Sequence, residues 1–319
     1  MAIKNNGRKT SENKNMIKTI NHNKLAWYHI DKLDDESILF LENNFHFHTL
    51  DIKDIRSEAE ESKIDIYKNY LFLIIQFPTL HRMTGQIGYM ELDVFLGKDF
   101  LVTIQKEKNK SMRDFYYHAQ NNHGFRKACF LYGPGYLLYR ILQKLYRDTR
   151  SITNYVSKKA IALEDMVYGD AIDENTAREI AYLRKKILSL ERIFEPERKV
   201  FGTLSKLNAE FAHADLNVYF DDIDDYVGKV WNFLDNQKHS MKDLLEVHDS
   251  LLTHATNKVI KILAVISVAI MPLTLLSGIY GMNIDLPFSG SPSMVWFVFF
   301  MLLILIAATV FFFKRKKWM

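Results

Sequence analysis

The residues of this chain that are best placed to meet a metal ion are neutral. Tyr280, Gly281, Met282 and Asn283 end one apolar run, and a second apolar run begins at Met294. At the mouth of a membrane helix, a glycine permits a tight turn and an asparagine amide presents an oxygen to an approaching cation. An asparagine here can also simply cap a turn, so the interpretation depends on the helix that precedes it.

One face of the first apolar run carries a stripe of small and polar residues. Its members recur at spacings of three and four, which places them on one side of a helix. Copies of this helix around an axis would line a pore with the stripe. Small and polar residues also permit close packing of membrane helices, and the spacing alone leaves both interpretations open. The stripe consists of Asn257, Ile260, Ala264, Ser267, Met271, Thr274 and Gly278.

Two segments are long enough to cross a bilayer. Residues 262–279 and 294–313 contain no Asp, Glu, Lys or Arg, and about 20 helical residues cover a hydrocarbon core of about 30 Å. Basic residues flank the pair of segments, whereas the loop between them contains neither Lys nor Arg. The positive-inside rule therefore predicts a multi-pass protein of the cell (inner or plasma) membrane with both termini cytosolic. The basic interface residues are Lys258, Lys261, Lys314, Arg315, Lys316 and Lys317.

The rest of the chain has the composition of a soluble domain. Of the 319 residues 25% are charged, and the net charge of +4 is mild, so we expect no nucleic-acid partner. The single cysteine, Cys129, excludes an intrachain disulfide and suits a reducing cytosol. The sequence shows no nucleotide loop, activated nucleophile or cluster of metal ligands, so we expect neither an enzyme nor an organic cofactor.

Strand patterns come first along the soluble part, and helical patterns follow. The strands predict an antiparallel sheet, with Pro78 ending one of them and Asp34 capping a helix. The last helix continues unbroken into the first span, and at roughly 60 residues it would be about 90 Å long, so it needs neighbours. The expected elements are strands at 25–31, 67–77, 90–96 and 100–105 and helices at 136–167, 177–214 and from Asp221 onward.

Several features together resemble the CorA family of magnesium and cobalt channels. The first span carries Pro272-Leu273-Thr274, the segment Gly278-Ile279-Tyr280-Gly281-Met282-Asn283 follows, and a second span and a basic C-terminus complete the pattern. Residues 48–55, 136–139 and 219–222 are also similar to family segments, so the resemblance covers roughly residues 25–319. The Gly-Met-Asn triplet is specific only in this setting.

The resemblance implies an α+β membrane protein that assembles with itself as a funnel-shaped homopentamer in the lipid bilayer. A cytosolic α/β/α domain, a long helical stalk and two C-terminal transmembrane helices would make up each subunit. The expected segments are a disordered polar tail at 1–23, the cytosolic α/β/α domain with long helices at 24–218, the stalk helix at 219–261, transmembrane helices at 262–279 and 294–313, the outer signature loop at 280–293 and a basic cytosolic tail at 314–319.

The resemblance also assigns residues to ion transport. A ring of Asn283 side chains, supported by the three residues before it, would form the outer mouth. The stripe would line the pore, with Ile260 and Met271 as apolar collars that gate by dewetting. Because Mg²⁺ sheds its water reluctantly, neutral amide oxygens can hold the hydrated ion through its water shell. The implied function is transport of Mg²⁺, and also of Co²⁺ and Ni²⁺, driven by the membrane potential.

Intracellular divalent ions close the channels of this family at sites between neighbouring subunits. The matching positions here are Asp54 and Asp222, where a bridging Mg²⁺ would remove the repulsion between two carboxylates. Mg²⁺ is therefore expected both as the transported and as the regulatory ion. The chain departs from the family pattern at Lys53, where some relatives carry Glu, and at residues 286–288, which replace the common Met-Pro-Glu of the outer loop.

Two alternative functions stay open at this point. The chain could form a membrane-anchored oligomeric metal sensor or scaffold that conducts nothing, in which case Asp54 and Asp222 would be its functional part. It could also be a transporter of the same fold that prefers another divalent ion, such as Zn²⁺.

Overall fold

The computed structural model describes residues 17–81, 84–107, 109–169, 174–207, 217–283 and 292–315. The chain divides into two compact units. One comprises Met1–Asp165 and Arg178–Lys242, and the other comprises Met166–Ala177 and Asp243–Met319.

A mixed six-stranded sheet lies at the centre of the first unit. Its strand order is β1-β2-β6-β5-β4-β3, and only the pair of β2 and β6 is parallel. The predicted hairpin is confirmed as β5 and β6, whereas the expectation of a purely antiparallel sheet is wrong at β2. The strands are β1 (Ile17–His22), β2 (Leu25–Ile30), β3 (Lys63–Ile66), β4 (Tyr70–Leu80), β5 (Ile87–Gly97) and β6 (Phe100–Gln105).

The N-terminal segment corrects the expected tail. We predicted a disordered stretch over residues 1–23, but residues 17–22 form the edge strand β1, which pairs with β2. Ile20 is buried, and Lys18 pairs with the carboxylate of Asp31. One buried side chain and the backbone ladder to β2 therefore order a segment whose composition is largely polar. Residues 1–16 of the expected tail lie outside the described residues.

Pro78 does not end a strand as predicted. Strand β4 continues through it to Leu80, with Pro78 opposite Tyr89 of β5. Beyond Ile74, β4 pairs with β5 alone among the described strands. A proline is tolerated there because its missing N–H can face the open side of the strand.

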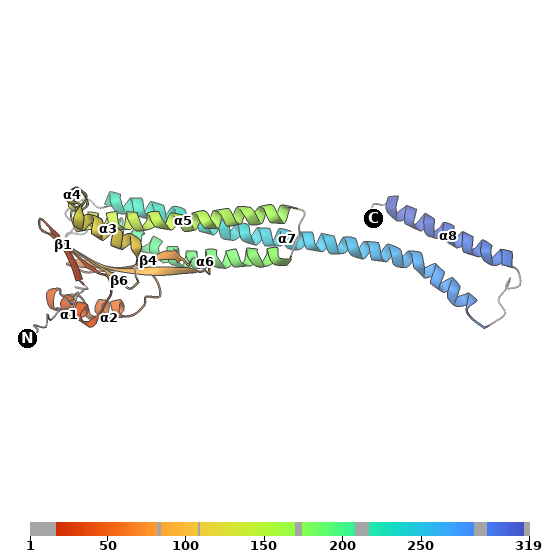
Figure 1. Ribbon diagram of the computed structural model, residues 1–319, viewed down its shortest axis with the longest axis horizontal. Coiled ribbons are helices and arrows are strands. Elements are labelled where there is room, and N and C mark those ends of the chain that lie inside the picture. The colour runs from red at the N-terminus through yellow and green to blue at the C-terminus, as the bar shows by residue number, and fades with distance from the viewer. Residues whose placement is uncertain are drawn as a thin grey trace, which may run out of the picture. The chain divides into compact units, whose positions relative to one another are not determined.

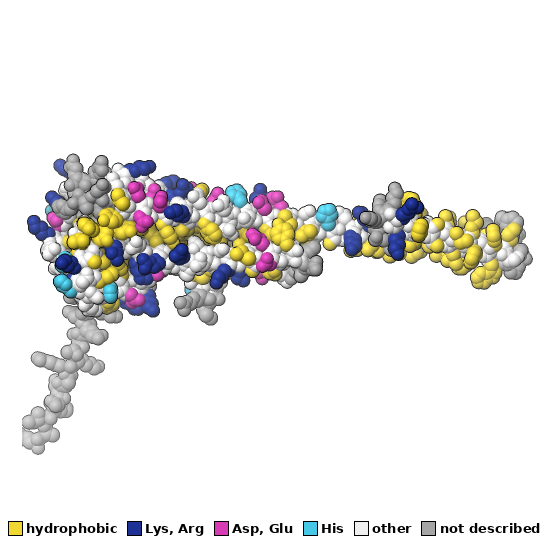
Figure 2. Space-filling model, turned by 90° about the horizontal axis from the view of Figure 1, so that it is seen from above, with side chains coloured by type: hydrophobic (Ala, Val, Ile, Leu, Met, Phe, Trp, Pro, Cys, Tyr) yellow, Lys and Arg dark blue, Asp and Glu magenta, His cyan; other side chains and the backbone are white. Residues whose placement is uncertain are grey.

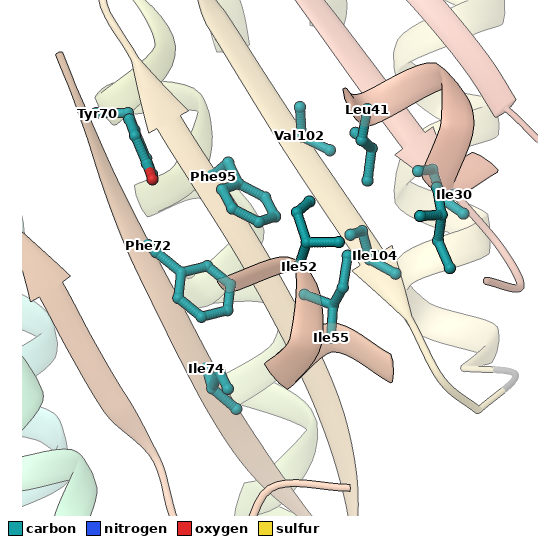
Figure 3. Close-up of a cluster of buried hydrophobic side chains, with 11 residues drawn as sticks. Ile30, Leu41, Ile52, Ile55, Tyr70, Phe72, Ile74, Phe95, Val102 and Ile104 are labelled. Carbon is teal, nitrogen blue, oxygen red and sulfur yellow. The ribbon is translucent and has the colours of Figure 1, made fainter. Parts of the chain in front are cut away.

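Two short helices cover one face of the sheet (Figure 1). Helix α1 (Asp35–Asn44) begins as predicted, because the Asp34 side chain accepts a hydrogen bond from Ser37 N at 2.8 Å. Helix α2 (Thr49–Arg56) follows it. Ile52 and Ile55 of α2 project onto Phe72 and Phe95 of the sheet (Figure 3). This apolar contact fixes the height and rotation of α2 above the strands.

Helices also pack on the opposite face of the sheet, which makes this unit an α/β/α structure. Trp27 of β2 lies 5.0 Å from the ring of Tyr116, and Phe77 of β4 lies 4.9 Å from the ring of Tyr146. The helices that follow β6 are α3 (Lys110–Asn121), α4 (His123–Phe130), α5 (Pro134–Tyr168) and α6 (Glu174–Leu204). Helix α6 ends ten residues before the predicted Ala214, and residues 208–216 lie outside the described ones.

The predicted unbroken final helix is confirmed as α7 (Asn217–Tyr280), which is 64 residues long. It begins four residues before Asp221 and two residues before the expected start of the stalk. In the first unit it buries Val227, Leu234 and Met241, and Lys238 bonds Glu191 of α6 at 2.8 Å. Packing against α5 and α6 thus stabilises the N-terminal part of a helix that is too long to be stable alone.

The second unit contains the C-terminal part of α7 and helix α8 (Pro292–Arg315). Each has a stretch long and apolar enough to cross a membrane, with mean hydropathy of 2.5 in α7 and 2.8 from Trp296 to Arg315. Figure 2 shows hydrophobic side chains covering the visible face of this apolar region. Of the two apolar stretches, 6% and 0% are buried inside the structure, as expected for surfaces that face lipid or other copies of the chain.

Candidate ion pathway and regulatory acids

Every residue of the predicted stripe is exposed on α7. The two expected collars protrude strongly, since Ile260 is 55% exposed and Met271 is 74% exposed. The neighbouring Val265, by contrast, is 3% exposed. The stripe is therefore one continuous surface of the helix, and in a single chain it has no covering layer among the described residues.

The two hydroxyls of the stripe bond to their own helix. Ser267 Oγ donates to the carbonyl of Leu263 at 2.8 Å, and Thr274 Oγ1 donates to that of Ile270 at 3.3 Å. This back-bonding satisfies each hydroxyl proton inside the helix and leaves the oxygen lone pairs free to accept. Both residues can therefore tolerate an apolar surrounding and still accept hydrogen bonds from water around a cation.

The helix ends in a tight turn at the start of the expected outer loop. Gly281 N donates to the Ser277 carbonyl at 3.0 Å, and Met282 N donates to that of Ile279 at 3.2 Å. We expected Gly281 for its backbone freedom, but it has no positive φ. A Cβ at this position would lie 3.1 Å from the Ser277 carbonyl oxygen, so it is the close approach of backbone that favours glycine.

Asn283 follows this turn and is exposed, as are Tyr280 and Met282. The polar amide thus lies three residues beyond the last residue of α7. The remainder of the expected outer loop, including Asp285 and residues 286–288, lies outside the described residues.

Basic residues flank both apolar helices, as the sequence predicts. Lys258 and Lys261 are exposed on α7, and Lys314 and Arg315 are exposed in the last turn of α8. Cations in the last turn also complement the helix dipole. Lys316 and Lys317 lie outside the described residues.

The two predicted regulatory acids have different partners within one chain. Asp54 lies on α2 with its side chain about one-third exposed, and it accepts from Lys63 Nζ at 2.6 Å. Asp222 is exposed in the first part of α7, and it accepts from the Tyr139 hydroxyl at 3.1 Å. Burial and this contact raise the pKa of Tyr139 to about 12, so the phenol stays a donor. The predicted pairing joins Asp54 of one subunit to Asp222 of its neighbour.

The acids around Asp222 form a charged patch on one turn of helix. Asp221 and Asp225 are exposed, whereas Asp224 is half-buried. Burial raises the pKa of Asp224; Lys206 opposes this shift, while Asp221 and Asp225 add to it. Mutual repulsion of this kind is what a bound cation would relieve.

Sequence reasoning missed a second group of charges near Asp54. Carboxylate oxygens of Asp51, Asp54 and Asp65 lie within 4.8 Å of one another, and Lys63 lies among them. The local pattern held a partial signal. Asp51 and Asp54 are three apart on a helix, and Lys63 and Asp65 are two apart on a strand, so each pair shares a face. Only the packing of α2 beside β3 brings the two pairs together.

These features define the class first: a membrane protein with a soluble α/β unit, a long continuous helix and two apolar helices. The family follows from comparison with known proteins. The family described as CorA-like Mg2+ transporter protein matches residues 22–315, so the chain belongs to this family of divalent metal cation transporters. Its members are transporters and channels, not enzymes.

Individual relatives are distant but cover most of the chain. A putative metal ion transporter, YfjQ of Bacillus subtilis, is 26% identical over 84% of this chain and 82% of its own length. The cobalt/magnesium transport protein CorA of Thermotoga maritima is 24% identical over 76% of this chain and 68% of its own. The zinc transport protein ZntB of Pectobacterium atrosepticum is 22% identical over 94% and 90%, respectively.

The fold has a counterpart among solved structures. The complete structure of the CorA magnesium transporter from Methanocaldococcus jannaschii superposes with a TM-score of 0.77. The two proteins are 20% identical, and the match covers 94% of each chain. This likeness confirms the predicted combination of an α/β soluble domain, a long helix and two apolar C-terminal helices.

Proposed function

We propose that this chain is the subunit of a homopentameric channel that conducts Mg²⁺ across the cell membrane, with Co²⁺ and Ni²⁺ as further permeant ions. The observation that carries the proposal is the exposed stripe on α7. The hydroxyls of the stripe bond to their own helix, and the exposed amide of Asn283 follows the end of that helix. Five copies around an axis would cover the stripe and surround a path lined by neutral acceptors.

A neutral path suits a hydrated dication. Asn283 at the outer mouth would accept hydrogen bonds from the water shell, with Tyr280, Gly281 and Met282 holding the turn. Ile260 and Met271 would be apolar constrictions that close by dewetting. Because a 2+ ion gains about 4.6 kcal/mol per 100 mV of inside-negative potential, the membrane potential alone suffices to drive uptake.

Cytosolic control is assigned to Asp54 and Asp222 of neighbouring subunits. Both carboxylates are at least partly exposed, so a second chain can reach them. A bridging Mg²⁺ would hold adjacent subunits in the closed arrangement, and its loss at low internal Mg²⁺ would restore the repulsion and loosen the ring. Both termini are assigned to the cytosol.

Purified full-length protein in liposomes tests this function. With an inside-negative potential we expect Mg²⁺, Co²⁺ and Ni²⁺ uptake that falls as internal Mg²⁺ rises. Absence of divalent flux from well-incorporated pentamers would contradict the channel and favour the non-conducting sensor. A monomeric or dimeric state in detergent would exclude the pore as described.

Zinc transport is the second candidate, because ZntB is among the relatives. The intact Gly-Met-Asn segment favours Mg²⁺. The same liposomes assayed with Zn²⁺ distinguish the two candidates, since a zinc transporter would take up Zn²⁺ in preference to Mg²⁺ at equal concentrations.

A further inference from the structure

The ammonium group of Lys63 lies beside Asp54, one of the proposed regulatory acids, where a metal ion would bind. We infer that its ammonium group is a tethered competitor of the regulatory divalent ion at Asp54 and lowers the sensitivity of this protein to internal Mg²⁺. The inference rests on the proposed function only in assigning Asp54 to regulation.

The geometry is that of a bound cation between two carboxylates. Lys63 Nζ lies 2.6 Å from an oxygen of Asp54 and 2.7 Å from one of Asp65. These are the short distances of charge-assisted hydrogen bonds. A lysine ammonium is charged near neutral pH, so both contacts are ion pairs.

Neighbouring contacts hold this ammonium in place. Lys63 lies on β3, the last strand of the sheet, and its Nζ is 5.2 Å from the centroid of the Phe72 ring, within cation–π range. Asp65 projects from the same face of β3 because it is two residues further on. The strand therefore presents both the cation and its second anchor to Asp54.

The third acid of the group has other partners. Asp51 is buried and accepts from the hydroxyls of Tyr67 at 2.8 Å and Tyr70 at 2.7 Å. Burial and the contacts to Asp51 raise the pKa of Tyr67 to about 12, so this donor persists. Asp51 thus helps to hold α2 in place, and the cation contacts fall to Asp54 and Asp65.

The end of α2 is also fixed, so Asp54 cannot easily move away from Lys63. Lys106 of the segment after β6 donates to the carbonyls of Ser57 and of Asp54, the latter at 3.5 Å, and it pairs with buried Glu91. A divalent ion that binds the Asp54 oxygen held by Lys63 must therefore displace this ammonium, and an ion at the other oxygen is repelled by the same charge.

Only molecules in which Lys63 has left Asp54 can bind the ion at the oxygen that it held. The apparent affinity for Mg²⁺ is therefore the intrinsic affinity multiplied by the fraction of such molecules. Because both ion pairs of Lys63 are only partly buried, each is weak, and we expect the competition to reduce the apparent affinity for Mg²⁺ by about threefold to tenfold. The same displacement leaves the intrinsic coordination of the ion by Asp54 unchanged.

The test is a Mg²⁺ titration of the full-length protein in detergent at constant ionic strength, followed by the shift in thermal unfolding. Asp54→Asn defines which part of the shift comes from this acid. We expect Lys63→Met to lower the half-saturating Mg²⁺ concentration by about threefold to tenfold, and Lys63→Gln to do the same. Lys63→Arg, which keeps the charge, should stay within about twofold of the unmodified protein.

Lys53→Met is the matched control. It removes one positive charge from the residue next to Asp54, but Lys53 is exposed and belongs to no ion pair among the described residues. Equal midpoints for Lys63→Met and Lys53→Met would overturn the inference, as would a response in Lys63→Met that Asp54→Asn does not remove. Flux in liposomes is scored separately. Lack of flux contradicts the channel, whereas an unchanged midpoint contradicts only the role of Lys63.

Discussion

The end of α7 and the surroundings of α2, the two regions proposed to bind ions, carry opposite kinds of side chain. At the end of α7, the exposed polar groups include the Asn283 amide and the Thr274 hydroxyl, which bonds to its own helix. Beside α2, carboxylates crowd within 4.8 Å and an ammonium lies between two of them. Among the described residues, the first region offers a dication only neutral acceptors, and the second offers full negative charge.

In the proposed channel, the difference follows from what each region must do with an ion. Two unit charges 4 Å apart attract by about 4 kcal/mol at an effective dielectric constant of 20, and a dication doubles this. A conduction site that strong would hold the ion too long, so neutral acceptors suit the mouth. A control site can bind for longer, and at the proposed one we infer that competing charges such as Lys63 tune the strength of binding.

Removing the neutral mouth should have the largest effect. We expect Asn283→Ala to reduce Mg²⁺ flux by at least about 100-fold, because a ring would lose all its amide acceptors together and each is worth about 1 kcal/mol. Uptake of Mg²⁺ into liposomes measures it, with size-exclusion chromatography confirming the oligomer. Thr309→Ala is the control, since it removes a back-bonded hydroxyl from α8. Retained flux in Asn283→Ala would show that the Asn283 amide is not needed for Mg²⁺ conduction.

The second-largest expected effect is a loss of stability when the packing of α2 on the sheet is weakened. Ile55 of α2 is 1% exposed in the core between helix and sheet, so we expect Ile55→Ala to destabilise the soluble unit by about 2–4 kcal/mol. Leu50→Ala on the same helix is the control, because Leu50 is 59% exposed and should change stability by less than about 0.5 kcal/mol. Urea unfolding followed by tryptophan fluorescence compares the two. Similar losses would mean that α2 is not held by its apolar face.

Glu197, a buried acid on α6, should make the stability of the soluble unit depend on pH. Burial raises the pKa of Glu197 well above its usual value, with the Tyr146 hydroxyl opposing the shift. The unfolded chain loses this proton near pH 4.3 while the folded chain retains it. The free energy of unfolding therefore falls as pH rises above about 4.3, by at most about 1.4 kcal/mol per pH unit for this group.

Glu197→Gln should remove that slope. Its unfolding free energy relative to the unmodified protein should increase from pH 4.5 towards pH 8, measured by urea unfolding at several pH values. Glu195→Gln, an exposed change on the same helix, should leave the slope as it is. A difference between Glu197→Gln and the unmodified protein that does not vary with pH would show that Glu197 ionises normally.

The smallest expected effect concerns the positioning of Asp222. Tyr139→Phe removes the hydroxyl that donates to this carboxylate, and we expect about a twofold to fivefold rise in the internal Mg²⁺ needed to inhibit flux. Tyr136→Phe is the control, because the Tyr136 hydroxyl contacts Arg140 instead. If both variants respond alike, the Tyr139 contact is structural and does not tune the control region.

Much of the fold could be predicted because its signals are local. The cap at Asp34, the hairpin of β5 and β6 and the unbroken α7 depend on residues close in sequence. The errors concern long-range pairing. Residues 17–22 are ordered by β2, and Pro78 is tolerated because no described strand pairs with β4 on its other side there.

The sequence by itself determined the two apolar helices, the stripe and the family, because helical periodicity and the signature segment are read from neighbouring residues. It also predicted Asp54 as a regulatory acid. Only the tertiary structure decided what Asp54 contacts. Packing of Ile52 and Ile55 on the sheet brings α2 beside β3, and this places Lys63 between Asp54 and Asp65. The strength of a charged site depends on such through-space neighbours, which spacing along the chain does not reveal.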